Sequence, residues 1–286
     1  MKTGLVMEGG AMRGMFTCGV IDVLMEHGIR FDGAGGISAG AVFGCNYKSG
    51  QIGRPIRYNK TYCRDKRYKS LRSLLTTGDL YGVDFCYREL PDELDVFDRK
   101  AFRENPMAFY VGATDVETGK IVYHACADGG DGDMQWMRAS ASMPLCSRVV
   151  EIDGYKLLDG GVVDPTPYFY MKEIGYDRCL VVLTQPKDYR KKKSAVLPLM
   201  RLALRKYPRM YEAMERRPAV YNAHVAAIRE DEKAGRCMVI CPPAPLPVHR
   251  MENDPEKLEQ AYQIGRTEAK KALQEILSFL ACGGNT

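Results

Sequence analysis

The sequence predicts an α/β protein. Within the first fifty residues, two short predicted strands, 4–8 and 32–37, are each followed by a glycine-containing turn and then by a pattern typical of a helix. Alternating strands and helices favour a sheet of mostly parallel strands, because each helix carries the chain back to the same edge of the sheet. The composition is that of a globular protein, since 45% of the 286 residues are hydrophobic and 27% are charged.

Each of the two segments is followed by a predicted helix. The first helix runs to about His27, because its apolar side chains recur at a spacing that places them near one face: Phe16, Val20, Val23 and Leu24. The second helix covers 39–49 and is rich in small residues. Residues 50–105 are charged and mixed, which predicts helices and loops in an excursion on the surface.

The middle of the chain predicts further strands. Two strands at 108–115 and 120–126 are joined by a tight turn, and a hairpin is expected over 148–158. Between them, a short helix is predicted at 131–142. Pro144 stops this helix, because proline cannot continue it.

The C-terminal half predicts mainly helices. The expected elements follow in order: a helix from Pro165 to about 175, a buried strand at 179–184, basic helices over 187–233, a strand at 236–241 and a long amphipathic helix at 254–281. No weak linker divides the chain. We therefore expect one domain over 1–286, with a core at about 3–185 and a helical extension at about 186–286.

Composition and cysteine spacing exclude several classes of protein. The formal net charge of +5 is too weak to predict nucleic-acid binding. Ten cysteines are scattered, and the one close pair, Cys237 and Cys241, lacks partners for a zinc site, which favours buried reduced thiols. The N-terminal apolar stretch is too short for a signal peptide, and no run of about 18 apolar residues occurs. We therefore expect a cytoplasmic protein.

A serine lies at the second predicted strand-to-helix turn. Gly36-Ile37-Ser38-Ala39-Gly40 fits the pattern G-x-S-x-G, in which small neighbours allow a strained turn that exposes the serine Oγ at a helix N-terminus. The alternative is that Ser38 only caps the following helix.

The first turn is rich in glycine. The segment Gly9-Gly10-Ala11-Met12-Arg13-Gly14 would present backbone N–H groups and a helix N-terminus to a phosphate or to a developing oxyanion. A dinucleotide-binding loop fits poorly, because the first triplet is Gly-Gly-Ala and the second strand leads into Ser38 rather than an acidic residue. The glycines could also serve only close helix packing.

The general base is expected to be an aspartate. None of the four histidines, at 27, 124, 224 and 249, carries a local signature of a catalytic base. Asp159 follows two leucines and precedes Gly160 and Gly161. A carboxylate would need desolvation or a short hydrogen bond to accept a serine proton, and a simple turn aspartate is the alternative.

Together, the three motifs resemble those of the patatin-like phospholipase family in type and order. Residues 9–14, 36–40 and 159–161 correspond to the family's glycine-rich oxyanion loop, its G-x-S-x-G and its D-G-[GA] motif. Residues 139–144 resemble the segment upstream of the aspartate, and the resemblance covers about 3–185. This chain departs from the family where Ala11 replaces a third loop glycine and where Glu8 replaces an aspartate. Alanine still has an N–H to donate, so Ala11 can serve the oxyanion hole if its φ stays negative.

The resemblance implies a three-layer α/β/α fold with a central, mostly parallel sheet and C-terminal helical additions. It implies that Ser38 attacks an acyl ester carbonyl of a lipid, that Asp159 acts as general base, and that water then releases the fatty acid from an acyl-serine. The backbone of Gly9, Gly10 and Ala11 would form the oxyanion hole. The motif-supporting residues are Met12, Arg13, Gly14, Gly36, Gly40, Gly160 and Gly161. No metal or cofactor is implied.

A basic tract distinguishes the extension. Residues 187–217 hold eleven basic and three acidic side chains, interleaved with leucine and methionine. The tract could lie on an anionic membrane surface or form a solvated helix packed on the core. A head-group-binding protein without turnover and a general carboxylesterase stay open as alternatives. Nucleic-acid binding is disfavoured, because few aromatic residues accompany the charges.

Overall fold

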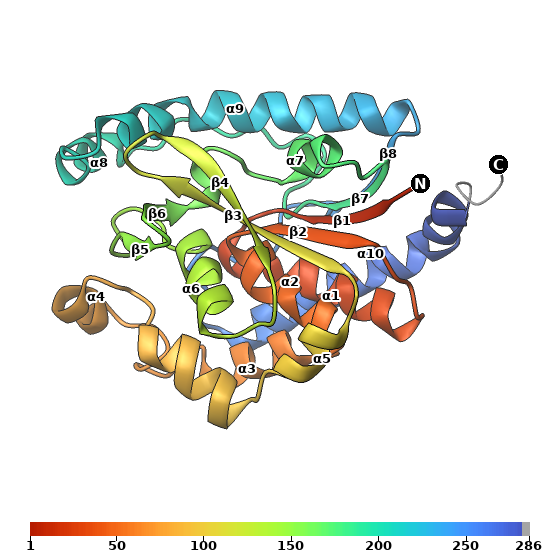
Figure 1. Cartoon of the computed structure of the whole chain (residues 1–286), viewed down its shortest axis with the longest axis horizontal. Coiled ribbons are helices and arrows are strands. Elements are labelled where there is room, and N and C mark those ends of the chain that lie inside the picture. The colour runs from red at the N-terminus through yellow and green to blue at the C-terminus, as the bar shows by residue number, and fades with distance from the viewer. Residues whose placement is uncertain (282–286) are drawn as a thin grey trace.

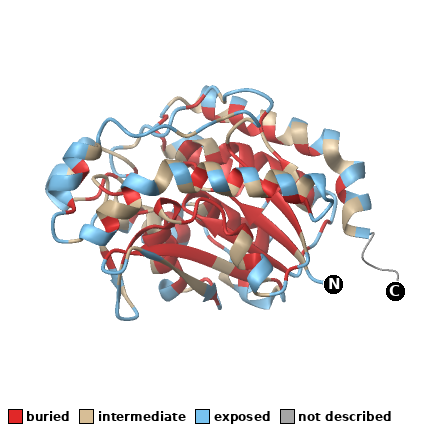
Figure 2. Cartoon of the chain, turned by 90° about the horizontal axis from the view of Figure 1, so that it is seen from above, coloured by how far each residue is buried: buried red, intermediate tan, exposed pale blue. Residues whose placement is uncertain are grey.

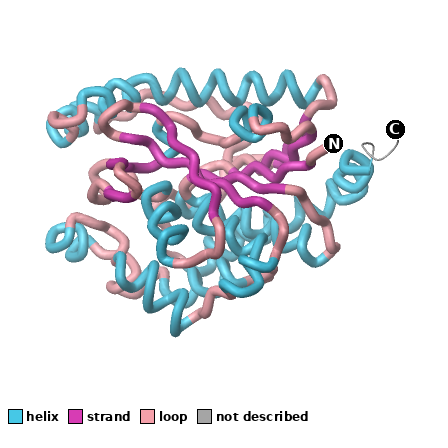
Figure 3. Tube along the Cα trace, viewed as in Figure 1, coloured by secondary structure: helices cyan, strands magenta, loops and turns pink. Residues whose placement is uncertain are grey.

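The central sheet divides the protein into layers. The computed structural model describes residues 1–281, in which eight strands form one sheet with the order β5-β6-β3-β2-β1-β7-β8 and β4 paired to β3 (Figure 3). The strands are β1 (Thr3–Met7), β2 (Gly33–Ile37), β3 (Ala108–Asp115), β4 (Lys120–Cys126), β5 (Val150–Ile152), β6 (Tyr155–Asp159), β7 (Arg178–Val182) and β8 (Cys237–Ile240). Pairing is parallel from β3 through β2, β1 and β7 to β8, and antiparallel among β3, β4, β5 and β6. The predicted α/β class with a mostly parallel sheet is confirmed.

Helices cover both faces of this sheet (Figure 1). The helices are α1 (Gly14–Glu26), α2 (Ala39–Ser49), α3 (Arg54–Tyr62), α4 (Leu71–Thr77), α5 (Arg99–Glu104), α6 (Asp131–Ser140), α7 (Tyr168–Glu173), α8 (Leu197–Ala203), α9 (Pro208–Lys233) and α10 (Pro255–Ala281). Short 3₁₀ turns cover Ala11–Arg13 and Gly160–Val162, and a π-helix covers Phe85–Leu94.

Alternate residues of each central strand pack on opposite layers. Leu5 and Met7 of β1 join the core formed with α1, α2 and α10, whereas Val6 joins the core formed with α7 and α9. The central strands β1, β2, β3 and β7 are consequently buried on both faces, as Figure 2 shows in red. This explains why these strands are continuous apolar or small-residue runs rather than alternating patterns.

Two stretches differ from the prediction. The segment 50–105 consists of helices and loops, as predicted, but it is more than a surface excursion. Several of its aromatic side chains are buried, among them Tyr58, Tyr68 and Phe85. The predicted helix at 187–233 begins only at Leu197, and 187–196 is irregular. On a helix, Arg190 and Lys193 would face each other three residues apart, and this repulsion disfavours helix there.

The C-terminal extension is integrated with the core. Strand β8 lies parallel to β7 at the sheet edge, and α10 packs along α1, where Tyr262 donates a hydrogen bond of 2.7 Å to Asp22 and Arg266 pairs with Glu26 at 2.8 Å. We propose on this basis that core and extension fold as one domain. No helix within residues 1–281 is long and apolar enough to cross a membrane.

The cysteines of the described chain are unpaired. All nine within residues 1–281 are free thiols, of which Cys86, Cys146 and Cys241 are half-buried and the rest buried. The tenth, Cys282, lies outside the described residues.

Candidate active site

Ser38 occupies a strained turn between β2 and α2. Its φ of 54° and ψ of −117° are unusual for a residue with a side chain, and its hydroxyl makes no capping hydrogen bond to α2. The helix-cap alternative is therefore not supported. The turn also brings two backbones into contact, since a Cβ on Gly40 would lie 2.3 Å from the Met7 carbonyl oxygen. The small residues of the motif permit this approach.

The Ser38 hydroxyl faces Asp159. Ser38 Oγ donates a hydrogen bond of 2.7 Å to Asp159 Oδ2, although 121 residues separate them. Asp159 ends β6 and is 1% exposed. The Oδ1 atom of Asp159 accepts a hydrogen bond from the Gly161 N–H at 2.7 Å, and the backbone carbonyl of Asp159 accepts one from Thr114 Oγ1 at 2.9 Å. The carboxylate is thus held in one orientation toward the serine.

Burial changes the basicity of this carboxylate. Removal from water raises the pKa of Asp159 above its ordinary value, while Arg217 and the hydrogen bonds from Ser38 and Gly161 oppose that rise. The net effect is a carboxylate that binds a proton more readily than an aspartate in water.

The glycine loop presents two unengaged N–H groups beside Ser38. The Gly9 N–H donates to the Pro165 carbonyl at 3.3 Å. The N–H groups of Gly10 and Ala11 have no acceptor within residues 1–281, and both residues line the same small pocket as Ser38 and Asp159. Of the three predicted oxyanion donors, Gly10 and Ala11 are therefore free to bind a ligand and Gly9 is not.

The backbone at Ala11 does not meet the condition of a negative φ, although its N–H is unengaged. Its φ is +49°, not negative, so an L-residue occupies the left-handed region at the position where the family usually has glycine. Alanine is the smallest side chain that can do so. Glu8 anchors the start of this loop, because its buried carboxylate accepts hydrogen bonds from the Thr184 N–H at 2.5 Å and hydroxyl at 2.9 Å.

Ser140 is a site residue that the motifs alone did not identify. Its hydroxyl accepts from the Ser38 N–H at 2.8 Å and donates to the Gly112 carbonyl at 2.6 Å. This bond occupies the Ser38 N–H, which is consequently unavailable to a ligand. The only sequence signal for Ser140 was its place in the segment 139–144.

The remaining motif residues support this geometry. Gly14 begins α1 against Phe43, and a Cβ on Gly160 would lie 2.3 Å from the Gly112 carbonyl. The structure places all of them around the two turns and the end of β6: Met12, Arg13, Gly14, Gly36, Gly40, Gly160 and Gly161.

A large apolar cavity opens beside Ser38. Its volume is about 460 Å³, roughly three times that of an engineered cavity that holds benzene. The walls come from α3, the π-helix, α6 and the loop after α6, with Tyr58, Leu90 and Met137 among the lining residues. The segment 50–105 thus forms a wall of the cavity, which no local pattern indicated.

The histidines lie elsewhere. None of the four lines either pocket that contains Ser38. His27 Nδ1 contacts the Val23 carbonyl at 2.9 Å, as its position at a helix end predicts. His224 and His249 lie near Asp164 and Glu252, at 3.4 and 3.3 Å.

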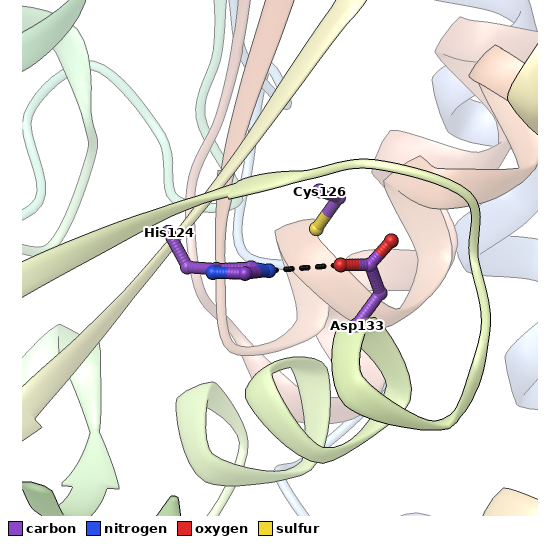
Figure 4. A group of neighbouring side chains, drawn as sticks. All are labelled: His124, Cys126 and Asp133. Atoms are coloured by element: carbon purple, nitrogen blue, oxygen red, sulfur yellow. Dashed lines mark hydrogen bonds and ion pairs between the residues drawn. The ribbon is translucent and has the colours of Figure 1, made fainter. Parts of the chain in front are cut away.

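One other cluster combines residue types that bind metals. Atoms of His124, Cys126 and Asp133 lie within 4.8 Å of one another (Figure 4). Asp133 already accepts from His124 Nε2 at 2.8 Å and from the N–H groups of residues 128 and 129, and burial raises the pKa of Cys126 well above its usual value. These bonds close the loop between β4 and α6. Cys126 is level with Ala34, at the opposite end of β2 from Ser38.

Comparison with known proteins identifies the family of this chain. A family model described as patatin-like phospholipase matches residues 5–171, and one described as a domain of unknown function matches 207–281. The chain is 25% identical to a patatin-like phospholipase domain-containing protein of Caenorhabditis elegans over 96% of this chain and 21% of that protein. It is 26% identical to Lysophospholipase NTE1 of Coccidioides immitis over 96% of this chain and 18% of that protein.

Two further similarities cover different shares of the chain. An uncharacterized NTE family protein of Mycobacterium tuberculosis is 27% identical over 63% of this chain and 48% of its own length. The crystal structure of VipD from Legionella pneumophila covers 96% of this chain and 67% of that one, with 14% identity and a TM-score of 0.49. The chain spans between about a fifth and a half of the length of the curated relatives named here. Because the first model covers more than half of the sequence and contains all three motifs, this chain belongs to the patatin-like phospholipase family.

Proposed function

We propose that this chain is a serine acylhydrolase that cleaves fatty-acyl ester bonds of phospholipids or lysophospholipids. The observation that carries the proposal is the 2.7 Å hydrogen bond from Ser38 Oγ to the buried carboxylate of Asp159. The family supports lipid ester hydrolysis, and relatives named lysophospholipases support this substrate class.

In the proposed reaction, Ser38 Oγ attacks the ester carbonyl carbon while its proton passes to Asp159. The carbonyl oxygen becomes an oxyanion and accepts hydrogen bonds from the Gly10 and Ala11 N–H groups. Collapse breaks the bond to the alcohol, which takes the proton from Asp159. A water molecule then attacks the acyl-serine, giving its proton to Asp159, and the fatty acid leaves as Ser38 regains a proton.

The apolar cavity supports a lipid substrate. Ser38, Ala11 and Met12 are among its lining residues, so an acyl chain lying in it could place its carbonyl beside the serine and the free N–H groups. Its volume lies within the range of ligand pockets, and its walls are mainly apolar.

Ester hydrolysis tests this proposal directly. We expect the protein to release p-nitrophenol from a long-chain acyl ester faster than from an acetyl ester, because only the long chain fills the cavity. Ser38→Ala should abolish turnover and labelling by a fluorophosphonate while leaving the circular dichroism spectrum unchanged. A folded wild type that hydrolyses neither ester, nor phospholipid in vesicles, would favour the alternative of a head-group-binding protein.

The pH dependence of kcat/KM should reflect the buried carboxylate. Asp159 must be ionised to accept the proton, and burial raises its pKa. Activity is therefore expected to be complete above this raised pKa and to fall as the pH drops through it, with the acid limb lying above the ordinary range for aspartate. A pH–rate profile of the soluble ester measures this limb. An acid limb at or below the usual aspartate pKa would contradict the assignment.

We also propose that the basic tract contacts anionic membranes. Apolar side chains of α8 and the residue before it are exposed among the charges: Val196 by 45%, Leu199 by 57% and Leu202 by 65%. Val196 also lines the apolar cavity, so this surface borders the route to Ser38. Leu199→Glu with Leu202→Glu should reduce co-sedimentation with vesicles containing phosphatidylserine.

A further inference from the structure

Four cationic side chains converge on the small pocket beside Ser38. Arg13 lies in the glycine-rich loop, Lys191 lies in the loop after β7, Arg217 lies on α9, and Arg250 precedes α10. The pocket they line also contains Ser38 and Asp159. Its volume of about 50 Å³ has room for a polar group of a few heavy atoms.

The carboxylates of this pocket do not balance the four cations. Two carboxylates line it, and both are already engaged: Glu8 accepts from Thr184, and Asp159 accepts from Ser38 and Gly161. Four basic side chains therefore face two carboxylates. Within residues 1–281, none of the four cations forms an ion pair with a carboxylate.

Much of the donor capacity of these cations is unused. Arg217 donates from Nε to the Gly161 carbonyl at 2.7 Å, and its remaining N–H groups have no acceptor in the described chain. Arg13 Nε is buried without a partner. Lys191 Nζ lies 4.3 Å from the centroid of the Tyr221 ring, which leaves its N–H donors available.

Placing these cations together has an electrostatic cost. Burial, together with Arg217, Arg250 and Arg13, lowers the pKa of Lys191 to about 7, whereas Glu8 opposes that shift. A bound anion would offset the repulsion and restore the charge of the lysine. Guanidinium groups present planar paired donors that match the oxygens of a phosphate.

We propose that Arg13, Lys191, Arg217 and Arg250 form an anion-binding subsite that holds the phosphate of a lipid substrate beside Ser38. The inference rests on the proposed acylhydrolase function and adds to it a preference for lipids that carry a phosphate. The apolar cavity and the cationic pocket share Ala11, Ser38, Met143 and Arg250, so they meet at the serine. An acyl chain in one and a phosphate in the other would place the ester between them at Ser38.

The subsite also gives a role to the C-terminal segment. Only Arg13 lies within the matched patatin-like segment 5–171. Arg217 and Arg250 lie within 207–281, the match to a domain of unknown function, and Lys191 lies between the two matches. The segment beyond the family core would then select the head group of the substrate.

Paired substrates test the subsite. Hydrolysis by the parent protein is measured with a 1-acylglycerol 3-phosphate and with a 1-acylglycerol of the same acyl chain, both below their critical micelle concentrations. We expect kcat/KM to favour the phosphate ester. In Lys191→Met and in Arg250→Met, that preference should fall roughly tenfold or more, mainly through KM, as expected for losing a charge-assisted contact. Lys270→Met, an exposed lysine of α10 outside the pocket, serves as control and should keep the parental preference.

A binding measurement separates this inference from the proposed function. Calorimetry with Ser38→Ala should show tighter binding of the acylglycerol phosphate than of the acylglycerol, and adding Lys191→Met should weaken only the former. This result would support the subsite even if hydrolysis failed. Equal preference in the parent and both variants would overturn it. Inorganic phosphate should bind weakly, and binding as tight as that of the lipid would overturn the lipid phosphate as the ligand.

Discussion

Asp159→Asn is expected to lower kcat/KM for ester hydrolysis by about a thousandfold or more. Asparagine has almost the same shape but cannot accept the proton of Ser38, and its amide N–H₂ would face either the serine hydroxyl or the Gly161 N–H. Burial makes both effects severe, because no water can replace the lost acceptor. Steady-state kinetics on a soluble ester measure the change.

The matched control is Asp153→Asn. Asp153 lies in the turn before β6 with a φ of +52°, which asparagine tolerates, and its carboxylate accepts from Trp136 Nε1. This variant should keep most of the activity, so a loss confined to Asp159→Asn identifies the base. Near-full activity of Asp159→Asn would require another base and would refute the proposed dyad.

The strands and the position of Ser38 could be predicted because their signals are local, whereas the pairing of Ser38 with Asp159 was implied by the resemblance to the family. Each predicted strand exists in the structure, since turn glycines and apolar runs determine where a strand begins and ends. The position of Ser38 follows from one five-residue turn, and the order of the three motifs indicated its partner. Geometry that depends on a single residue was less predictable, as the positive φ of Ala11 shows.

Contacts made only in the tertiary structure could not be predicted. Arg217 belongs to a helix whose sequence is typical of a solvated basic face, and only the packing of α9 turns its side chain toward Gly161. Likewise, Tyr58 and Leu90 occur in a charged segment, and their role in the cavity wall depends on which side of that segment meets α6 and α2. Sequence periodicity identifies an apolar face, but it does not identify the surface that this face will cover.

The largest effect on stability is expected where α1 and α10 cross. A Cβ on Gly19 would lie 2.0 Å from the Tyr262 carbonyl oxygen, and a Cβ on Gly265 would lie 2.0 Å from the Phe16 carbonyl oxygen. Both obstacles are backbone atoms of the opposite helix, so neither can turn aside. Gly19→Ala or Gly265→Ala should lower the free energy of unfolding by about 2–3 kcal/mol, despite the higher helix propensity of alanine. Urea denaturation followed by circular dichroism measures the loss.

Gly132→Ala in α6 provides the control, because a Cβ there meets no atom within 4 Å and alanine should be neutral or slightly stabilising. The double variant Gly19→Ala with Gly265→Ala tests whether the extension is part of one domain. A single outward shift of α10 would relieve both clashes, so the double variant should cost less than the sum of the single variants, within one cooperative transition. A separate early transition that leaves the core intact would show instead that α10 docks on a domain that folds without it.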